Sequence, residues 1–154
     1  MFRVFKKTAI TDEKLTLAVE EQNQKGGISG RKLELVTRDD QQNVEALKRA
    51  VNELVDQQVV AIIGPLTSSM AVAAQPLVNA SKVVMISPTA KTDQLSGLDD
   101  YFLRVTAPIS KNAQQLASYV TQDMNLKRFA IVYDLSNRAF TEIWLNSFTE
   151  AFEG

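Results

Sequence analysis

VVAIIGPLTSS, residues 59–69, joins a run of five apolar residues to a loop of proline, threonine and serine. VVMISPTAKT, residues 83–92, has the same design, with four apolar residues followed by a loop rich in hydroxyl side chains. Uninterrupted β-branched runs are typical of strands buried on both faces, as in parallel sheets. Loops that leave such strands at their carboxyl ends border the crevice where open α/β sheets bind ligands. The two loops are therefore the best candidates for half of a small-molecule site.

Segments with strand and helix patterns alternate along the rest of the chain. Strands are predicted at residues 33–36, 59–63, 83–86, 101–105 and 129–133, and residues 2–5 can supply a further strand. Helices are predicted at residues 11–25, 43–55 and 68–80, from residue 110 onward, and from Phe140 to Phe152. Strands and helices that alternate at this spacing indicate βαβ units with right-handed crossovers. We therefore expect an α/β fold with a mostly parallel sheet flanked by helices.

Individual residues indicate how these helices begin, end and pack. Asn43 and Ser68 stand where a helix N-cap is expected, and the glycine pair at 26–27 should end the first helix. Pro76 lies inside the third predicted helix, so we expect a kink there or a helix held by packing. The apolar positions at helical spacing in the last two helices are Leu116, Tyr119, Val120, Phe140, Ile143, Trp144, Phe148 and Phe152. The aromatic residues of the last helix are expected in a core or at an interface.

The composition excludes several kinds of site. The chain has 154 residues, a net charge of −1, and neither cysteine nor histidine. Disulfides, zinc sites built on Cys or His, and Ser–His or Cys–His catalysis are therefore excluded. Carboxylates, lysine and tyrosine leave acid–base catalysis open. The sequence has no basic stripe of the kind that would indicate a nucleic-acid surface. No apolar run approaches the ~18 residues that a membrane-spanning helix needs.

The two strand-exit loops contain the candidate ligand-binding residues. In the first loop these are Thr67, Ser68 and Ser69, and in the second they are Thr89, Ala90, Lys91 and Thr92. A helix that begins near Ser68 would present unpaired N–H groups and the positive end of its dipole to a carboxylate. Lys91 would add a positive charge to the second loop. The structural alternatives are that Ser68 only caps its own helix and that Lys91 is a surface lysine in a turn.

Asp39 and Asp40, together with Asp134, allow a different hypothesis. Carboxylates that follow parallel strands form the acidic pocket of phosphate-receiving α/β switch domains. The alternative is that Asp39 and Asp40 lie in a solvated loop before a helix. The glycines at residues 26–30 follow a predicted helix and precede a strand, which is the reverse of the order in a dinucleotide-binding motif.

Four stretches, taken in order, resemble one protein family. They are AVEEQNQKGGISGRKLELV at residues 18–36, DDQ at 39–41, AIIGPLTSS at 61–69 and ISPTA at 86–90. The combination resembles the branched-chain amino-acid receptor type of periplasmic substrate-binding protein, the receptor component of ABC importers. The resemblance implies two α/β lobes that close on a ligand, with no catalysis and no cofactor or metal.

The resemblance also implies roles for particular residues. Ser68 corresponds to the serine that contacts the ligand carboxylate, and Thr89 to a position whose backbone contacts the ligand. Lys91 stands where leucine-type receptors usually carry a threonine, so either Thr92 takes that role or the ligand is more acidic. The expected ligand is small and polar, an amino acid or another carboxylate. Ser136 and Arg138 are the candidate loop residues of the second lobe.

The chain is shorter than the members of this family, which are more than twice its length. By resemblance, residues 1–107 form the first ligand-binding lobe, and residues 108–154 form a crossover helix and the first strand and helix of the second. The glycine-rich loop after the family's opening strand has no counterpart in residues 1–12. The full-length protein is expected in the periplasm or outside the cell, with an ABC permease or sensor as partner. A homodimer through the apolar surface left open, including the Trp144 helix, is a further expectation.

Overall fold

Five short strands form one parallel sheet in the computed structural model, which describes residues 2–5 and 9–154. The strands are β1 (Phe2–Phe5), β2 (Leu33–Leu35), β3 (Ala61–Ile63), β4 (Val84–Ser87) and β5 (Phe102–Arg104). Their order across the sheet is β2-β1-β3-β4-β5, and every neighbouring pair is parallel. The predicted α/β fold is confirmed, and residues 2–5 do supply a strand. The expectation for the loop that follows concerns residues 6–8, which lie outside this description.

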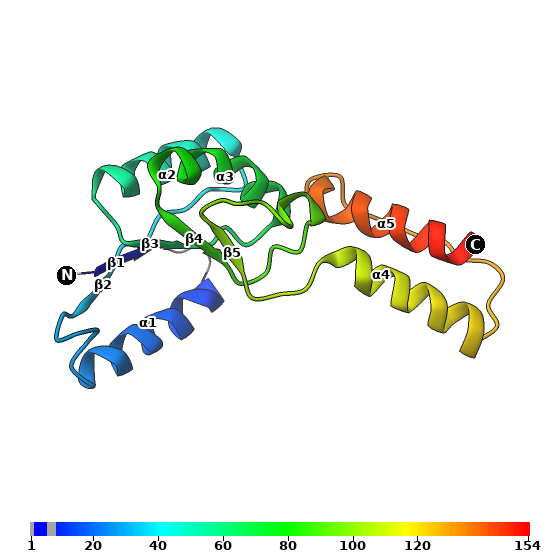
Figure 1. The fold of residues 1–154 in the computed structure, drawn as a ribbon, viewed down its shortest axis with the longest axis horizontal. Coiled ribbons are helices and arrows are strands. Elements are labelled where there is room, and N and C mark those ends of the chain that lie inside the picture. Colours follow the sequence, from blue (N-terminus) through cyan, green and yellow to red (C-terminus); the bar gives the residue numbers. More distant parts are fainter. Residues whose placement is uncertain (1, 6–8) are drawn as a thin grey trace.

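Five helices surround or extend from the sheet (Figure 1). They are α1 (Ala9–Gln24), α2 (Val44–Asp56), α3 (Ser68–Ser81), α4 (Ile109–Ser118) and α5 (Arg138–Glu153), with a 3₁₀ turn η1 (Asp93–Leu95) and a π-helical turn η2 (Tyr119–Asp123). Helices α2 and α3 cover one face of the sheet, and α1 lies on the other (Figure 1). Helices α4 and α5 lie side by side and lead away from the sheet (Figure 1). No helix of the described residues is long and apolar enough to cross a bilayer.

The ends of two helices follow directly from their sequences. The side chain of Asn43 accepts hydrogen bonds from the backbone N–H groups of Glu45 and Ala46, so Asn43 caps α2 as predicted. After α1, Gly27 has a φ of 78°, and its N–H donates to the carbonyl of Gln22. A Cβ at Gly27 would lie 2.1 Å from the Arg31 carbonyl oxygen. Glycine is therefore required at this position, both for its backbone conformation and for the space.

The main core lies between the sheet and the two helices that cover it. Its central members are fully or almost fully buried: Leu47, Val51, Leu54, Ile62, Ala71, Ala74, Val78 and Met85. Helix α3 continues through Pro76, which is itself exposed. Pro76 supplies no N–H to the helix ladder, so α3 depends on the burial of its neighbours Ala74 and Val78.

A second, smaller core joins α4 to α5. Phe148 is 1% exposed and stacks on Trp144 at 4.9 Å and on Phe152 at 5.7 Å between ring centroids. Phe129 approaches Phe148 at 5.0 Å. The prediction that the aromatic side chains of the last helix form a core is confirmed for Phe148, which packs with Ala113 and Ala117 of α4 and with Val120 of η2.

The face of α4 that packs on α5 differs from the prediction. Leu116 and Tyr119 are exposed, whereas Ala113 and Ala117 are fully buried. Small side chains allow the two helix backbones to approach, and the large aromatic rings of α5 then fill the space between them. Of the predicted apolar positions Leu116, Tyr119 and Val120, only Val120 is buried, and it lies in η2.

The predicted strand at residues 129–133 is wrong, because the structure shows no secondary structure from residue 125 to residue 134. The segment is apolar and β-branched, as strands are, but a strand also needs a neighbour with which to form its hydrogen bonds. No described strand lies beside this segment, because all five strands belong to the sheet of the main core.

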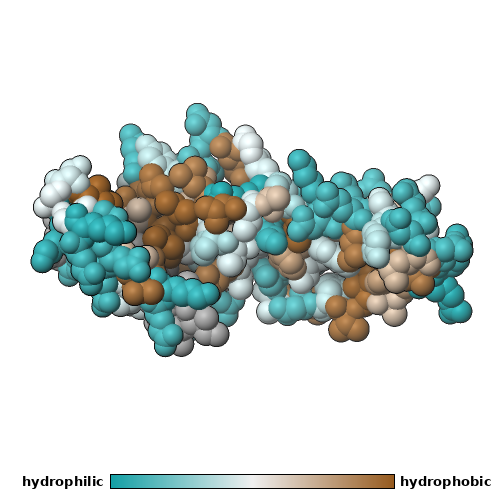
Figure 2. Space-filling model, turned by 90° about the horizontal axis from the view of Figure 1, so that it is seen from below, coloured by the Kyte–Doolittle hydropathy of each residue, from teal (hydrophilic) through white to brown (hydrophobic). Residues whose placement is uncertain are grey.

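The face of the sheet next to α1 keeps an apolar groove. Figure 2 shows apolar side chains gathered on this side of the molecule, between polar borders. The groove has a volume of about 370 Å³, and the residues that line it are Leu15, Ala18, Val19, Ile28, Leu33, Val60, Ala61 and Ile63. Helix α1 therefore covers only part of this face within the described residues.

Candidate ligand site

The structure joins the two strand-exit loops directly. Ser87, at the end of β4, donates its hydroxyl hydrogen to the carbonyl oxygen of Pro65 at 2.7 Å, and its oxygen accepts from the N–H of Ala90 at 3.0 Å. The Thr89 hydroxyl donates to the carbonyl of Leu66 at 2.5 Å. Parallel neighbours β3 and β4 end at the same edge of the sheet, so the loops after them meet there, as the sequence predicts.

Ser68 connects the start of α3 to the second loop. It is only 2% exposed, and its hydroxyl oxygen accepts the N–H of Lys91 at 3.1 Å. The prediction that Ser68 caps its own helix is therefore wrong. The N-cap position belongs to Thr67. A serine hydroxyl can accept two hydrogen bonds and donate one, so the Ser68 hydroxyl hydrogen can still be donated to a ligand.

Thr67 does not cap α3 with its side chain either. Its hydroxyl donates to the side-chain carbonyl of Gln42 at 3.3 Å, and its backbone has the extended conformation of an N-cap residue. The first N–H groups of α3 therefore donate no hydrogen bond to their own N-cap side chain. The positive end of the α3 dipole lies at these N–H groups, at the residue Ser68 where the helix begins.

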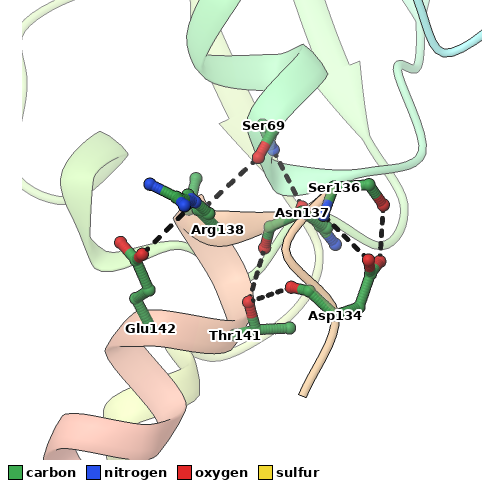
Figure 3. A network of polar contacts seen from close by, with 8 residues as sticks. Ser69, Asp134, Ser136, Asn137, Arg138, Thr141 and Glu142 are labelled. Atoms are coloured by element: carbon green, nitrogen blue, oxygen red, sulfur yellow. Dashed lines mark hydrogen bonds and ion pairs between the residues drawn. The ribbon is translucent and has the colours of Figure 1, made fainter.

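Ser69 of α3 and Asn137 before α5 exchange caps, as Figure 3 shows: the side chain of each residue accepts a backbone N–H from the first turn of the other helix. The backbone N–H of Ser69 donates to the side-chain carbonyl of Asn137 at 3.1 Å, and the Ser69 hydroxyl accepts the N–H of Ala139 at 3.3 Å. Asn137 is the N-cap residue of α5, yet its side chain makes no cap bond to its own helix. Sequence reasoning missed this role, because an asparagine before a helix normally indicates a cap for that helix alone.

The loop that leads into α5 is held by a polar network (Figure 3). The carboxylate of Asp134 accepts from the backbone N–H and the hydroxyl of Ser136, at 2.8 and 2.6 Å. These bonds lower the pKa of the Asp134 carboxyl below its ordinary value, because they favour the ionised form. Thr141 donates its hydroxyl to the Asp134 carbonyl at 2.7 Å. Arg138 lies 3.5 Å from Glu142 in an exposed ion pair on α5.

The second loop uses most of its polar groups to hold its own shape. Ala90 is buried, and its carbonyl accepts the Thr106 hydroxyl at 3.2 Å. Thr92 is also buried, and its hydroxyl accepts the N–H of Gln94 at 3.3 Å. The ammonium group of Lys91, by contrast, has no hydrogen bond or ion pair to any residue that the structure describes. Lys91 is therefore the charge in this loop that remains available to a ligand.

The aspartates proposed for a phosphate-receiving pocket have structural roles in their own loop. Asp39 and Asp40 each accept the N–H two residues ahead, from Gln41 and Gln42, at 2.8 Å. Asp39 is exposed, but Asp40 is fully buried, so the expectation of a solvated loop is wrong for Asp40. Among the described residues no cluster of three or more acidic, His or Cys side chains could hold a metal ion.

An Asn137→Ala variant tests the exchanged caps. We expect it to lose about 1 kcal/mol of stability, the usual effect of removing a helix cap, and to speed hydrogen exchange at the Ser69 amide. Exchange measured by NMR would detect both effects. Asn146→Ala is the matched control, because Asn146 is exposed and lies in the middle of the same helix. Unchanged protection of the Ser69 amide in Asn137→Ala would contradict the exchange of caps.

Comparison with known proteins gives consistent matches. The model of a family described as periplasmic binding protein matches residues 14–147. A Leu/Ile/Val-binding protein of Rhizobium johnstonii is 34% identical over 119 residues, which are 76% of this chain and 32% of that protein. The Leu/Ile/Val-binding protein of Escherichia coli is 31% identical over 118 residues, with the same coverage. The chain therefore spans about a third of the length of these curated relatives.

Solved structures match almost the whole chain. The branched-chain amino acid transporter substrate-binding protein LivJ of Streptococcus pneumoniae, in complex with isoleucine, gives a TM-score of 0.88 at 27% identity. The match covers 100% of this chain and 47% of that one. A substrate-binding protein of an ABC transporter from Desulfitobacterium hafniense, in complex with leucine, gives a TM-score of 0.81 at 26% identity, over 99% of this chain and 46% of that one.

Proposed function

The chain belongs to the periplasmic binding protein family, a family of binding proteins rather than enzymes. From this membership we propose that it contains one ligand-binding lobe of an ABC-transporter substrate receptor. In this proposal residues 1–107 form the first ligand-binding lobe. Residues 108–154 then form the crossover and the beginning of the second lobe. The separate cores of the sheet and of the α4–α5 pair support this division.

The observation that carries the proposal is the junction of the two strand-exit loops at Ser68. The Ser68 hydroxyl is held in place by the N–H of Lys91 and keeps its own hydrogen for a ligand. It lies at the first residue of α3, where the helix dipole favours a negative group. A carboxylate placed there would receive a hydrogen bond from Ser68 and lie near the start of α3. Thr67, Ser69, Thr89, Ala90 and Thr92 shape the two loops around it.

We propose a small polar ligand with a carboxylate group, either an amino acid or another acid. Leucine and isoleucine are bound by two structures that resemble this chain, which makes branched-chain amino acids the first candidates. The free ammonium of Lys91 favours a second negative group on the ligand. Dicarboxylates and acidic amino acids are therefore the second candidates.

The proposed setting follows from the family. A receptor of this type would collect its ligand in the periplasm, or outside the cell, and present it to an ABC permease or a sensor. The described part of the chain would supply one half of the ligand contacts.

A thermal-shift screen tests the proposal. The panel contains leucine, isoleucine, valine, glutamate and succinate, with leucinol as the control that lacks the carboxylate. A ligand at 100 times its Kd adds about 2.7 kcal/mol to stability, which for a chain of this size is a shift of roughly 5–10 °C. We expect at least one acid to produce such a shift and leucinol to produce none. A folded protein that responds to no acid at millimolar concentration would contradict the proposal.

A further inference from the structure

Helix α4 receives its N-terminal cap from the loop that follows β4, the second of the two strand-exit loops. The N-cap residue of α4 is Pro108, whose side chain has no oxygen that could accept a hydrogen bond. The N–H of Ile109, the first residue of the helix, donates to the carbonyl oxygen of Lys91 at 2.8 Å. The N–H of Ser110 donates to the carboxylate of Asp93 at 3.2 Å. The second loop therefore provides the cap of α4 from a position 17 residues before Ser110.

Asp93 holds Ser110 with both oxygens of its carboxylate. One oxygen accepts the N–H of Ser110, and the other accepts its hydroxyl hydrogen at 2.5 Å. A side-chain oxygen that accepts the second N–H of a helix is what an N-cap residue normally provides. The negative charge of Asp93 also lies at the positive end of the α4 dipole. The Asp93 side chain therefore takes over the role that Pro108 cannot perform.

Lys91 links this cap to the candidate ligand site. Its N–H donates to the hydroxyl oxygen of Ser68, and its carbonyl oxygen accepts the N–H of Ile109. The backbone of one residue therefore joins the start of α3, where we propose that a carboxylate binds, to the start of α4. Asp93 lies only two residues further along the chain and fixes the same short segment. A displacement of residues 91–93 would alter both the ligand site and the beginning of α4.

The chain that leads into α4 lies along the second loop. The carbonyl of Ala90 accepts the Thr106 hydroxyl at 3.2 Å, and the carbonyl of Thr92 accepts from the Arg104 guanidinium at 2.6 Å. With the carbonyl between them, three consecutive carbonyl groups of the loop accept hydrogen bonds from residues 104–109. The Asp93 contact, by contrast, is made by a side chain of the loop. A substitution at Asp93 can therefore remove this contact and leave the backbone acceptors in place.

We propose that Asp93 is a positioning residue of the ligand site, which holds Ser110 and thereby keeps Lys91 in place at the edge of the site. The same contact couples the site to the α4–α5 pair. Both helices of this pair begin beside the sheet (Figure 1), and α5 is capped in a similar way, because the Ser69 hydroxyl of the first loop accepts an N–H from its first turn. The coupling to a ligand rests on the proposed function, whereas the positioning of the loop does not.

Hydrogen exchange in the ligand-free chain tests the positioning role. In Asp93→Ala we expect the amides of Ser110 and Lys91 to exchange roughly fivefold faster, the change that corresponds to the loss of a typical cap. The Lys91 amide is the decisive probe, because its own acceptor, Ser68, is unchanged in this variant. Asp93→Asn should restore most of the protection, since asparagine keeps a side-chain oxygen for the N–H of Ser110. Faster exchange at Ser110 with unchanged exchange at Lys91 would mean that Asp93 only caps α4, and would overturn the proposal.

Asp99→Ala is the matched control. Asp99 is exposed in the same connection between β4 and β5, and it has no hydrogen bond or ion pair to any residue that the structure describes. The variant removes the same charge as Asp93→Ala and should leave exchange at Lys91 unchanged. Faster exchange at Lys91 in both variants would show an effect of charge alone and would also overturn the positioning role.

Ligand binding tests the coupling. For the best acid of the thermal-shift panel, we expect the Kd to rise about fivefold in Asp93→Ala, at the lower end of typical couplings between sites, and to stay unchanged in Asp99→Ala. Because such coupling is reciprocal, saturating acid should slow exchange at the Ser110 amide of the unsubstituted chain and not of Asp93→Ala. An unchanged Kd in Asp93→Ala would overturn the coupling. If no acid binds the unsubstituted chain, the proposed function fails, and exchange at Lys91 in the ligand-free chain still decides the positioning role.

Discussion

The Phe148→Ala variant is expected to lose about 3–5 kcal/mol of stability, the range for truncating a buried phenylalanine. Phe148 is the only side chain of α5 with almost no exposure among the described residues, and three rings surround it. Removing it leaves a cavity between α4 and α5 and also loses the ring contacts with Trp144, Phe129 and Phe152. The other buried members of this core, among the described residues, are the smaller Ala113, Ala117 and Val120.

The loss should be local, because the two cores share no residue. The core of the sheet is built from α2, α3 and the strands, whereas Phe148 belongs to the core between α4 and α5. Cooperative units of this kind can open with different free energies. We therefore expect α4 and α5 to separate in Phe148→Ala at denaturant concentrations that leave the sheet folded.

The single tryptophan makes this measurable. Trp144 is the only tryptophan of the chain and stacks on Phe148 at an interplanar angle of 11°. Its fluorescence and near-ultraviolet circular dichroism report on the small core, and far-ultraviolet dichroism reports on the whole chain. In Phe148→Ala the tryptophan transition should move to lower denaturant than the far-ultraviolet transition. Phe140→Ala is the matched control, because Phe140 is on the same helix, is partly exposed and makes no ring contact with the other described residues. Transitions that coincide in Phe148→Ala would show that the chain unfolds as one unit.

The architecture around the sheet could be predicted because its signals are local. The five apolar residues 59–63 and the helical spacing in 43–55 each specify an element from a few neighbouring side chains. The order of those elements then leaves few topologies, since right-handed crossovers between parallel strands are nearly universal. Even the meeting of the two loops follows, because neighbouring parallel strands end at the same edge.

The segment 129–133 shows what local sequence patterns cannot predict. Its composition is that of a strand, and the composition alone cannot reveal whether a neighbouring strand exists. The same limit explains the error on α4. The spacing of Leu116 and Tyr119 matches a helix face, but the depth to which they are buried depends on the size of the rings on α5.

The contacts at the candidate site could not be predicted either, because their partners are far apart in sequence. Ser68 accepts the N–H of Lys91, 23 residues away, and Ser69 exchanges caps with a helix 68 or more residues away. The residue types predicted that these hydroxyl groups would form hydrogen bonds near a helix end. It could not show which of several N–H groups each would bind, because cap residues accept from any N–H within reach.

Ser68→Ala is expected to weaken binding of the best acid from the thermal-shift panel about 10- to 100-fold. A hydrogen bond to a charged group contributes about 1.5–3 kcal/mol, and each 1.4 kcal/mol is a factor of ten in Kd. Ser68 is the buried hydroxyl of the first loop whose hydrogen has no acceptor among the described residues. Two neighbouring hydroxyl groups already donate elsewhere, that of Thr67 to Gln42 and that of Thr89 to Leu66.

The variant should also be less stable without ligand, and this second readout separates the two roles of Ser68. Alanine leaves the N–H of Lys91 without its acceptor, which costs about 1–3 kcal/mol where the group stays buried. Ser81→Ala is the control, because Ser81 lies at the exposed end of the same helix and its hydroxyl bonds only to the Leu77 carbonyl. A Ser68→Ala protein with lowered stability and unchanged affinity would mean that the hydroxyl only fastens the second loop. A Lys91→Met variant provides the comparison for affinity. If Ser68→Ala loses more affinity than Lys91→Met, the Ser68 hydroxyl is the main contact to the ligand and Lys91 adds a second contact.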